Sequence, residues 1–425
     1  MPTSQPDCVL FNVHAYLGQR RNATTASATT RSHDKIEVSL FPARPPLPSE
    51  LYVHCPVLRL TVLPRVIRTT EDLLLLRVAV DCPPNLDDSS PRESDYRHPK
   101  GALAPAALAP APLLLRRDED VGLLSRGANY TVAALMADTG TPPAYDLHIF
   151  HSENPCEWIR RKVSVMEPMR RFPLLIPDNC SRLLHHETTT VVSIGGEGGT
   201  MGWADLWDGV LLCDVLRDEP TLRAVPVPVP LDLVSCDNGR GAQLDCPIPF
   251  RGIAFVKDNP NGDGCLKLVH KEANATLVPG NEYDDETGSP NFQMHDWTIL
   301  TYTNTAMTTS WKDWRRDSRL QASDITIDAQ IKSELLQSGS GLLGSAPGEA
   351  LHNLLVSHPA LDISAEAAHQ GVVYLMARKK YKQPTAWVLA LDTRNKTLLG
   401  AAEFGTERQP SAHMSCIAPA ALPSI

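Results

Sequence analysis

The stretch from Trp203 to Val215 reads Trp-Ala-Asp-Leu-Trp-Asp-Gly-Val-Leu-Leu-Cys-Asp-Val, and it indicates the fold more strongly than any other part of the chain. The dipeptide Asp208-Gly209 readily supplies the positive φ angles of a two-residue hairpin turn, and apolar residues flank it on both sides. The stretch therefore predicts two short antiparallel strands that are joined at Asp208-Gly209.

A two-residue turn at this point determines which residues lie opposite one another. It places Trp207 opposite Val210 and Trp203 opposite Asp214. Because side chains alternate between the two faces of a sheet, one face then carries no charged residue. That face consists of Ala204, Leu206, Leu211, Cys213 and Val215. The other face is also largely apolar, so we expect the hairpin to be covered on both sides, as in a stack of sheets.

The same register brings Asp205 and Asp214 onto one face, at a diagonal spacing of roughly 7 Å. Two such carboxylates can act as general acid and general base if one pKa is raised and the other is ordinary. Each Asp can instead accept hydrogen bonds from a turn or a neighbouring Trp, as buried carboxylates commonly do. The surrounding sequence contains no nucleophile, second base or metal ligand set, so the structural role is favoured.

The pattern Trp-x-Asp-Leu-Trp-x-Gly-x-Leu-x-Cys-Asp over 203–214 resembles the signature of a plant family of unknown function, catalogued as DUF1618 and expanded in grasses. Its signature positions here are Trp203, Asp205, Trp207, Gly209, Cys213 and Asp214. Segments at 225–228, 297–298, 311–314 and 371–392 agree with the resemblance, which covers most of the chain and places the family signature at about 203–340. The family has no established catalytic motif, so the resemblance implies no particular activity.

Composition narrows the class of protein. The 425 residues could form two or three average domains, or one large repetitive β domain. The net charge of −9 argues against binding nucleic acid through a broad basic surface. The 36 prolines cluster between apolar runs, which favours short strands and loops over long helices.

The chain carries no sign of export or of a membrane anchor. No apolar run approaches the roughly 18 residues of a membrane span, and the first residues lack the basic start and apolar core of a signal peptide. The ten cysteines are scattered without a Cys-x-x-Cys motif, which is typical of buried thiols in a reducing compartment. We therefore expect a soluble protein of the cytoplasm or nucleus that does not bind membranes.

Short strand-like runs recur every ~10 to 20 residues, as in β-sandwiches and β-propellers. The segment Lys35 to Phe41 alternates cleanly with period two, and aliphatic strands that end in Asp and lead into a turn recur at 210–214 and 388–392. The pattern predicts an all-β fold, a propeller-like array of short antiparallel sheets. The alternative is a pair of packed β-domains. The run 371–392 also resembles blades of kelch-like and F-box-associated propellers.

Composition suggests the following boundaries. Residues 8–82 are expected to form an N-terminal β segment that belongs to the same domain as the rest. Residues 83–116, rich in Pro and Ala, are expected to be a disordered insertion, and in the alternative arrangement the chain divides there. Residues 117–408 are expected to form the main propeller-like domain, and 409–425 a C-terminal tail.

Three motifs suggest chemistry, but a structural interpretation is favoured for each. The glycines of 195–202 are followed neither by the helix nor by the Lys of a phosphate-binding loop. Residues 259–264 partly mimic a calcium loop, but His270 stands where a bidentate Glu is expected. His148 and His151 would point to opposite faces of a strand, so they cannot share an ion. We therefore predict no catalytic residue, no metal and no cofactor.

Trp311, Trp314, Arg315 and Arg316 are candidates for an exposed aromatic and basic patch that recognises a protein partner. The alternative is that the two tryptophans pack in the core beside surface arginines. The sequence as a whole favours a non-catalytic protein-interaction or scaffold module that binds a protein and not nucleic acid. Two alternatives remain: a carboxylate-dependent hydrolase or sugar-active enzyme, and a substrate-recruiting adaptor resembling F-box-associated domains.

Overall fold

The structure is a computed structural model. It describes residues 8–29, 34–56, 63–70, 73–79, 94–97, 109–110, 117–138, 144–155, 157–166, 186–228, 246–257, 264–283, 291–337, 342, 351–363, 371–380, 383, 385–405 and 417–421. Regular structure in these ranges is almost entirely β-strand, with a single α-helix, α2 (Ala329–Gln337). The all-β prediction is therefore confirmed.

The described strands form six small sheets. The first sheet joins both ends of the described chain and has the order β27 (Ile417–Ala421), β1 (Cys8–Asn12), β5 (Pro48–His54), β4 (Lys35–Phe41) and β3 (Ala26–Thr29), with β2 (Tyr16–Leu17) beside β5. The second contains β6 (Arg65–Thr70), β7 (Leu73–Ala79), β8 (Ser94–Arg97) and β9 (Ala109–Pro110). The third contains β10 (Val121–Arg126), β11 (Asn129–Ala137), β12 (Ala144–His151) and β13 (Trp158–Ser164).

In the remaining sheets the antiparallel strands pair with their neighbours along the chain. The fourth contains β14 (Thr190–Gly195), β15 (Thr200–Asp205), β16 (Gly209–Asp214) and β17 (Leu222–Pro226). The fifth contains β18 (Arg251–Lys257), β19 (Gly264–Leu277), β20 (Phe292–Asn304) and β21 (Arg315–Gln321). The sixth contains β23 (Leu355–Leu361), β24 (Val372–Arg378), β25 (Thr385–Asp392), β26 (Thr397–Gly405) and the parallel strand β22 (Thr326–Ile327). The described ranges also contain four short 3-10 helices, η1 (Asp118–Asp120), η3 (Trp311–Asp313), η4 (Ala322–Asp324) and η5 (Leu351–Asn353).

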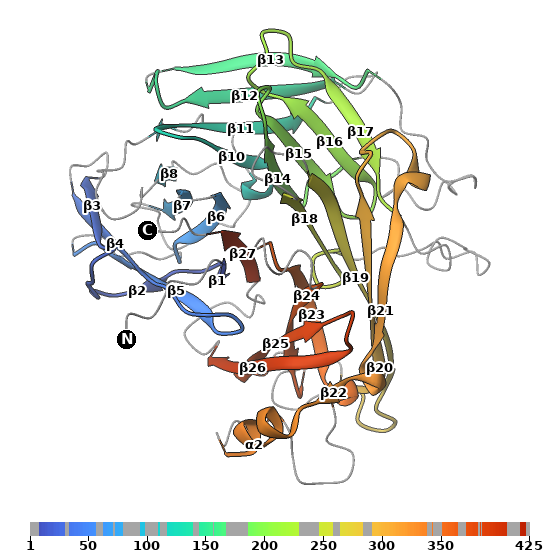
Figure 1. Cartoon of the computed structure of the whole chain (residues 1–425). Coiled ribbons are helices and arrows are strands. Elements are labelled where there is room, and N and C mark those ends of the chain that lie inside the picture. Colours follow the sequence, from blue (N-terminus) through green and yellow to red (C-terminus); the bar gives the residue numbers. More distant parts are fainter. Residues whose placement is uncertain are drawn as a thin grey trace.

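The sheets follow one another around a common axis, so the fold is a β-propeller (Figure 1). The innermost strands β6, β10, β14, β18 and β23 contact one another in succession, and β27 contacts both β23 and β6. Each pair of neighbouring sheets also encloses its own cluster of buried hydrophobic side chains. Because every sheet is packed on both faces, the ring closes without a separate core. The propeller-like prediction is therefore confirmed.

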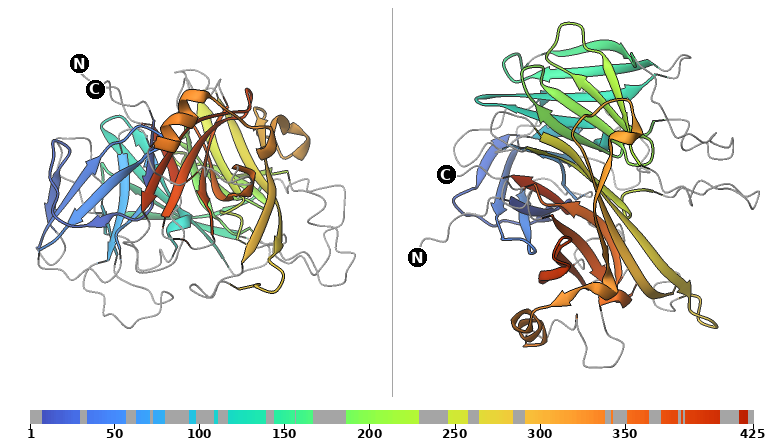
Figure 2. Two further views of the ribbon diagram at one scale, coloured as in Figure 1. Left: turned by 90° about the horizontal axis from the view of Figure 1, so that it is seen from below. Right: turned by 45° about the vertical axis from the view of Figure 1, so that its right-hand side comes forward.

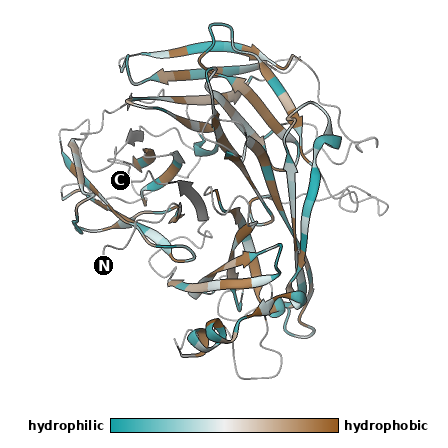
Figure 3. Ribbon diagram, viewed as in Figure 1, coloured by the Kyte–Doolittle hydropathy of each residue, from teal (hydrophilic) through white to brown (hydrophobic). Residues whose placement is uncertain are grey.

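Packing on both faces explains why strands in the middle of a sheet are almost continuously buried. All seven residues of β24 are buried, as are five of the six residues of β16. The outermost strand β21 is polar by contrast, as Figure 3 shows in teal. In Figure 2 the long hairpin of β19 and β20 extends beyond the ring, because these two strands are longer than their neighbours.

The ring is closed by the two ends of the described chain. Strand β1 pairs antiparallel with β27, from Cys8 opposite Ala421 to Asn12 opposite Ile417. Strand β27 thus lies within the range 409–425, which the sequence suggested as a tail. Strands β8 and β9 lie within the range 83–116, which it suggested as a disordered insertion, and the other residues of that range up to 116 lie outside the described residues.

The central hairpin is present, but its predicted register is wrong. In the structure Asp205 pairs with Gly209 and Trp203 pairs with Leu211, so residues 206–208 form a three-residue turn. Gly209 is the first residue of β16 and its φ is not positive. The prediction failed because the carboxylate of Asp205 closes a wider turn than Asp208-Gly209 would form by itself.

The corrected register also changes which residues share a face. Residues directed at the third sheet include Met201, Trp203, Leu211 and Cys213, whereas those directed at the fifth sheet include Ala204, Leu206, Val210 and Leu212. The predicted uncharged face combined β15 residues from one side with β16 residues from the other, and it is therefore wrong. The prediction that both faces are covered is confirmed.

Candidate functional site

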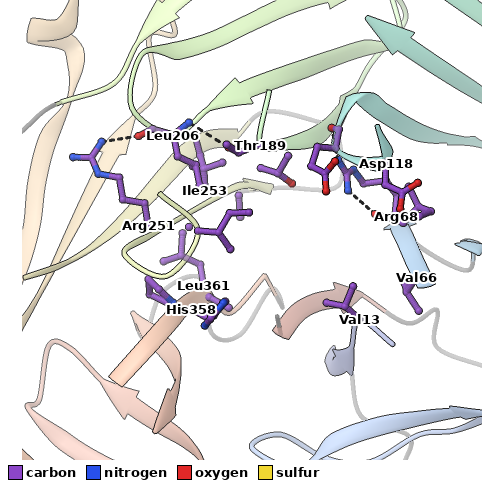
Figure 4. Close-up of a pocket in the computed structure, with 18 of the residues that line it drawn as sticks. Val13, Val66, Arg68, Asp118, Thr189, Leu206, Arg251, Ile253, His358 and Leu361 are labelled. Atoms are coloured by element: carbon purple, nitrogen blue, oxygen red, sulfur yellow. Dashed lines mark hydrogen bonds between the residues drawn. The ribbon is translucent and has the colours of Figure 1, made fainter. Parts of the chain in front are cut away.

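A cavity of about 200 Å³ lies near the propeller axis (Figure 4). Its wall is formed by inner strands and the segments beside them: β6, η1, β14, β18, β23 and the turn after β15. Part of the wall is charged and part is apolar. Both parts come from segments that are far apart in sequence, so ring closure creates the cavity.

Two carboxylates in the wall are held by arginines. Arg65 donates from Nη1 to Asp118 Oδ2 at 3.3 Å and from Nη2 to Glu119 Oε1 at 3.1 Å. Arg77 Nη1 lies 2.9 Å from Asp118 Oδ1. Burial raises the pKa of the Asp118 carboxyl above its ordinary value, against the opposite effect of Arg77 and Arg65. These ion pairs join the second sheet to the segment that precedes the third.

Asp120 follows in the same 3-10 helix, η1. Burial raises the pKa of its carboxyl to about 6, although Arg117 acts in the opposite direction. The backbone carbonyl of Asp120 accepts a 2.7 Å hydrogen bond from the indole Nε1 of Trp203. The signature residue Trp203, which is fully buried, thereby ties the fourth sheet to the segment that carries the charged wall.

Arg68 lines the same cavity from β6. Its Nη1 donates to the carbonyl of Ile67 and its Nη2 donates to the carbonyl of Glu119 at 2.7 Å. Its Nε is buried and has no hydrogen-bond partner within the described residues. Burial lowers the pKa of the Arg68 guanidinium to about 10, so the group remains charged at neutral pH.

Arg251 of β18 is buried on another side of the cavity and has neutral acceptors. It donates from Nε to His270 Nδ1 at 3.1 Å, from Nη1 to the carbonyl of Leu206 and from Nη2 to that of Pro228, both at 2.7 Å. Its guanidinium also lies 4.6 Å from the ring centroid of Trp207. Burial lowers the pKa of His270 to about 2, so this imidazole is neutral and can accept from Arg251.

His358 has the most unusual backbone in the cavity wall. Its φ is +54°, and the register of β23 shifts between Ser357 and Ala360. Its Nδ1 lies 2.9 Å from the hydroxyl of Ser357. Burial lowers the pKa of His358 to about 3, with the same effect from Arg378, so this ring is also neutral at pH 7.

The structure does not bring Asp205 and Asp214 together. Asp205 accepts from the backbone N–H groups of Trp207 (2.9 Å) and Glu187 (2.8 Å), and it is fully buried. Asp214 accepts from the Thr200 hydroxyl at 2.6 Å. Because Thr200 begins the strand that Asp205 ends, the two carboxylates are about 16 Å apart at about 3.3 Å per residue. The diagonal pairing that the sequence suggested is therefore wrong.

The other signature positions are structural as well. Trp207 lies in the turn against Arg251, and Gly209 begins β16. Cys213 is buried between the third and fourth sheets, and burial raises the pKa of its thiol to about 12. The thiol is therefore protonated and packs as a small apolar group.

The four residues of the predicted patch have different environments. Trp314 donates from Nε1 to the carbonyl of Pro226 at 2.6 Å and packs against the cluster between the fourth and fifth sheets. Trp311 is half-buried in η3, whereas Arg315 and Arg316 are exposed on the outermost strand β21. Trp314 thus anchors this segment, and the two arginines face solvent.

Sequence reasoning missed the charged cavity wall. Arg65 and Arg68 share β6, whereas Arg251 begins β18 far along the chain, and the three form no local motif. The one local signal is the run Arg117-Asp118-Glu119-Asp120, where three consecutive acidic residues directly before an apolar strand indicate partners elsewhere in the fold.

The described part of the chain has neither a metal-binding cluster nor a membrane-spanning helix. It has no group of three or more His, Cys, Asp or Glu side chains placed to hold a metal ion. None of its helices is both long and apolar enough to cross a membrane. The calcium-like segment at 259–264 lies outside the described residues up to 263.

Fold and cavity together define a β-propeller with a mixed charged and apolar axial cavity. The family described as "Protein of unknown function (DUF1618)" has a model that matches residues 203–374 of this chain. The resemblance inferred from the signature at 203–214 is therefore confirmed over this part of the chain. No curated protein matches the sequence.

Several solved structures are similar to the chain at a low level. An alpha-L-arabinanase from Cellvibrio cellulosa is 11% identical with a TM-score of 0.27, and the match covers 80% of this chain and 90% of that chain. The same enzyme complexed with arabinohexaose is 10% identical, with the same TM-score of 0.27 and the same 80% and 90% coverage. An uncharacterized protein from Listeria monocytogenes EGD-e is 9% identical with a TM-score of 0.25, covering 80% of this chain and 81% of that chain. At these values the similarities carry no argument about activity.

Proposed function

We propose that the chain is a non-catalytic interaction module. The supporting observation is that the ionisable groups of the axial cavity are engaged in structural contacts. Asp118 lies between Arg65 and Arg77, Glu119 is paired with Arg65, and the neutral ring of His358 contacts Ser357. A general acid or base has to be free to exchange a proton with a substrate, and ion pairing of this kind opposes that exchange.

The proposed partner is a protein with an acidic segment, and the proposed contact surface is the outer side of β21 with η3. Lys312, Arg315, Arg316 and Arg319 are all exposed there, and the Arg315 side chain is 80% exposed. We call these four residues the basic edge. A basic surface on a chain of net charge −9 favours an acidic protein segment, since the remaining negative charge would repel a long nucleic acid.

The hydrolase alternative loses its main candidate pair, because Asp205 and Asp214 lie at opposite ends of the hairpin. The adaptor alternative is a special case of the same module, distinguished by the identity of its partner. No contact in the described residues favours it over a scaffold.

Proximity labelling in cells that express the chain tests the module. We compare the wild type with Arg315→Glu/Arg316→Glu on β21, and with Arg160→Glu/Arg161→Glu on β13. Strand β13 is also the outermost strand of its sheet and also presents adjacent exposed arginines, so the control carries the same change of charge. We expect the β21 variant alone to lose specific proteins that the wild type labels. Loss in both variants, or in neither, contradicts the proposed surface.

The structural role of Asp205 is tested by Asp205→Asn. Because its buried carboxylate accepts from three backbone N–H groups, we expect the free energy of unfolding to fall by about 2–4 kcal/mol. Asp214→Asn is the matched control: this carboxylate pairs with an exposed Arg217, so the loss should stay below about 1 kcal/mol. Urea unfolding measures both. Equal losses in the two variants would contradict the assignment.

A further inference from the structure

Arg68 is a desolvated cation that contacts no carboxylate among the residues that the structure describes. Its two hydrogen-bond acceptors are the carbonyls of Ile67 and Glu119, and its buried Nε has none. A guanidinium has five N–H donors, and leaving such a group unpaired in a protein interior is costly. Arg68 therefore has donors to spare where it lines the cavity.

The nearby carboxylates are not hydrogen-bond acceptors of Arg68. Asp118 and Glu119 are in contact with Arg65 and Arg77, and they act on Arg68 only through space. Asp120 also acts on Arg68 through space, and its own surroundings include Arg117, Glu119 and Glu187. The wall near Arg68 is thus nearly balanced in total charge, but the guanidinium itself lacks a direct anionic partner.

Arg251, the second arginine of the cavity wall, is also buried and hydrogen-bonded to neutral groups. All three hydrogen-bond acceptors of Arg251 are neutral, and the carboxylate of Asp205 raises the pKa of its guanidinium against the larger, opposite effect of burial. Figure 4 shows Arg251 and Arg68 on opposite sides of the cavity. The cavity therefore lies between two buried guanidinium groups whose direct contacts are neutral.

The space between them is lined by apolar side chains. Leu206, Ile253 and Leu361 come from the fourth, fifth and sixth sheets and line the cavity together (Figure 4). The volume of about 200 Å³ is smaller than the roughly 300–1,000 Å³ of pockets that hold drug-sized molecules. The fitting ligand is accordingly a small molecule with a compact apolar body.

We propose that the axial cavity binds a small organic acid, with its carboxylate on Arg68 and its apolar body against Leu206, Ile253 and Leu361. A carboxylate matches the planar fork of a guanidinium and forms stronger hydrogen bonds with it than a neutral carbonyl does. This site is distinct from the basic edge, and it involves binding without a chemical step.

The experiment compares benzoate with benzamide, which has nearly the same shape but no charge, by titration calorimetry on the full chain. We expect benzoate to bind at least ten-fold more tightly than benzamide. Inorganic phosphate, an anion without an apolar body, should bind more weakly than benzoate. Equal binding of benzoate and benzamide, tighter binding of phosphate, or no binding of benzoate would overturn the proposal.

Two variants locate the site. Arg68→Met keeps an unbranched apolar stem and removes the donors, and we expect it to weaken benzoate binding at least ten-fold. Arg315→Met, on the exposed β21, is the control and should bind benzoate like the wild type. Unchanged binding in Arg68→Met refutes the proposed anchor. If Arg68→Met does not fold, the benzoate and benzamide comparison on the wild type still decides the question. The labelling result for the basic edge does not depend on either outcome.

Discussion

The buried guanidinium of Arg251 is stabilised by neutral hydrogen-bond partners. Arg251 joins the turn after β15 to the segment that follows β17 through two backbone carbonyls, and the neutral ring of His270 accepts from its Nε. A protonated His270 would place two cations in contact, which explains why Arg251 adds to the effect of burial in lowering the pKa of His270. The hydrogen bond therefore exists only while the imidazole is neutral.

His270 consequently makes stability depend on pH. Below pH ~6.5 the unfolded chain binds a proton at His270 that the folded chain does not bind, since the folded pKa is about 2. The free energy of unfolding therefore decreases as the pH falls, by about 1.4 kcal/mol per unit from this residue. Gln can accept the same hydrogen bond but does not titrate. We expect the decrease between pH 7 and pH 5 to be smaller by about 2 kcal/mol in His270→Gln.

Urea unfolding of the wild type and of His270→Gln at the two pH values measures this difference. Part of the decrease should persist in the variant, because burial also lowers the pKa of His358, to about 3. The same decrease in both proteins would show that His270 is protonated in the folded state.

Individual strands are positioned by close approaches between neighbouring sheets. Strand β18 meets β23 at Gly252, where an added Cβ would lie 2.2 Å from the carbonyl oxygen of Pro359. Since this atom belongs to the backbone, it cannot move aside as a flexible side chain would. Gly252 thus sets the spacing of the fifth and sixth sheets beside the cavity.

We therefore expect Gly252→Ala to force these two strands apart and to lower the free energy of unfolding by about 2 kcal/mol or more. Gly405→Ala is the matched control, because no atom lies within 4 Å of its added Cβ and its φ is not positive. That variant should be neutral or slightly stabilising, as the unfolded chain loses entropy. Urea unfolding gives both values. A neutral Gly252→Ala would mean that the two strands can separate at little cost.

The whole molecule depends on closure between the two ends of the described chain. Each of the other sheets is a run of consecutive strands, whereas the first sheet needs β27 to pair with β1. Strand β27 also supplies the contact between β23 and β6 that completes the ring. The cavity is therefore coupled to a pairing between residues about four hundred positions apart, a long-range contact that forms at high entropic cost.

Removing residues 406–425 tests this closure. The truncated chain lacks β27, so we expect a lower melting temperature and a broader transition in scanning calorimetry, because the first and sixth sheets would no longer be joined by that strand. Removing only residues 422–425 leaves β27 in place and should change neither quantity. A chain without 406–425 that melts like the full chain would show that the ring does not require β27.

Local pattern determined the class of structure here, and particular strands illustrate why. The period-two alternation of Lys35 to Phe41 predicted β4 with its observed bounds, because alternation is the pattern of a strand's two faces. Burial does not follow that alternation, since the polar residues Glu37 and Ser39 are buried as well. The apolar runs around 203–215 correctly indicated a hairpin covered on both faces. The family resemblance rested on this same stretch and was confirmed by the match over 203–374.

Tertiary structure decided the hairpin register, the closure of the ring and the candidate site. The register depends on a carboxylate that folds back onto its own turn, a contact that competes with the intrinsic preference of Asp208-Gly209. The cavity combines Arg68, Arg251 and Leu361, which belong to three different sheets and share no spacing in sequence. Sequence patterns record short-range burial, whereas a site at a propeller axis depends on how sheets distant in the chain pack around the ring.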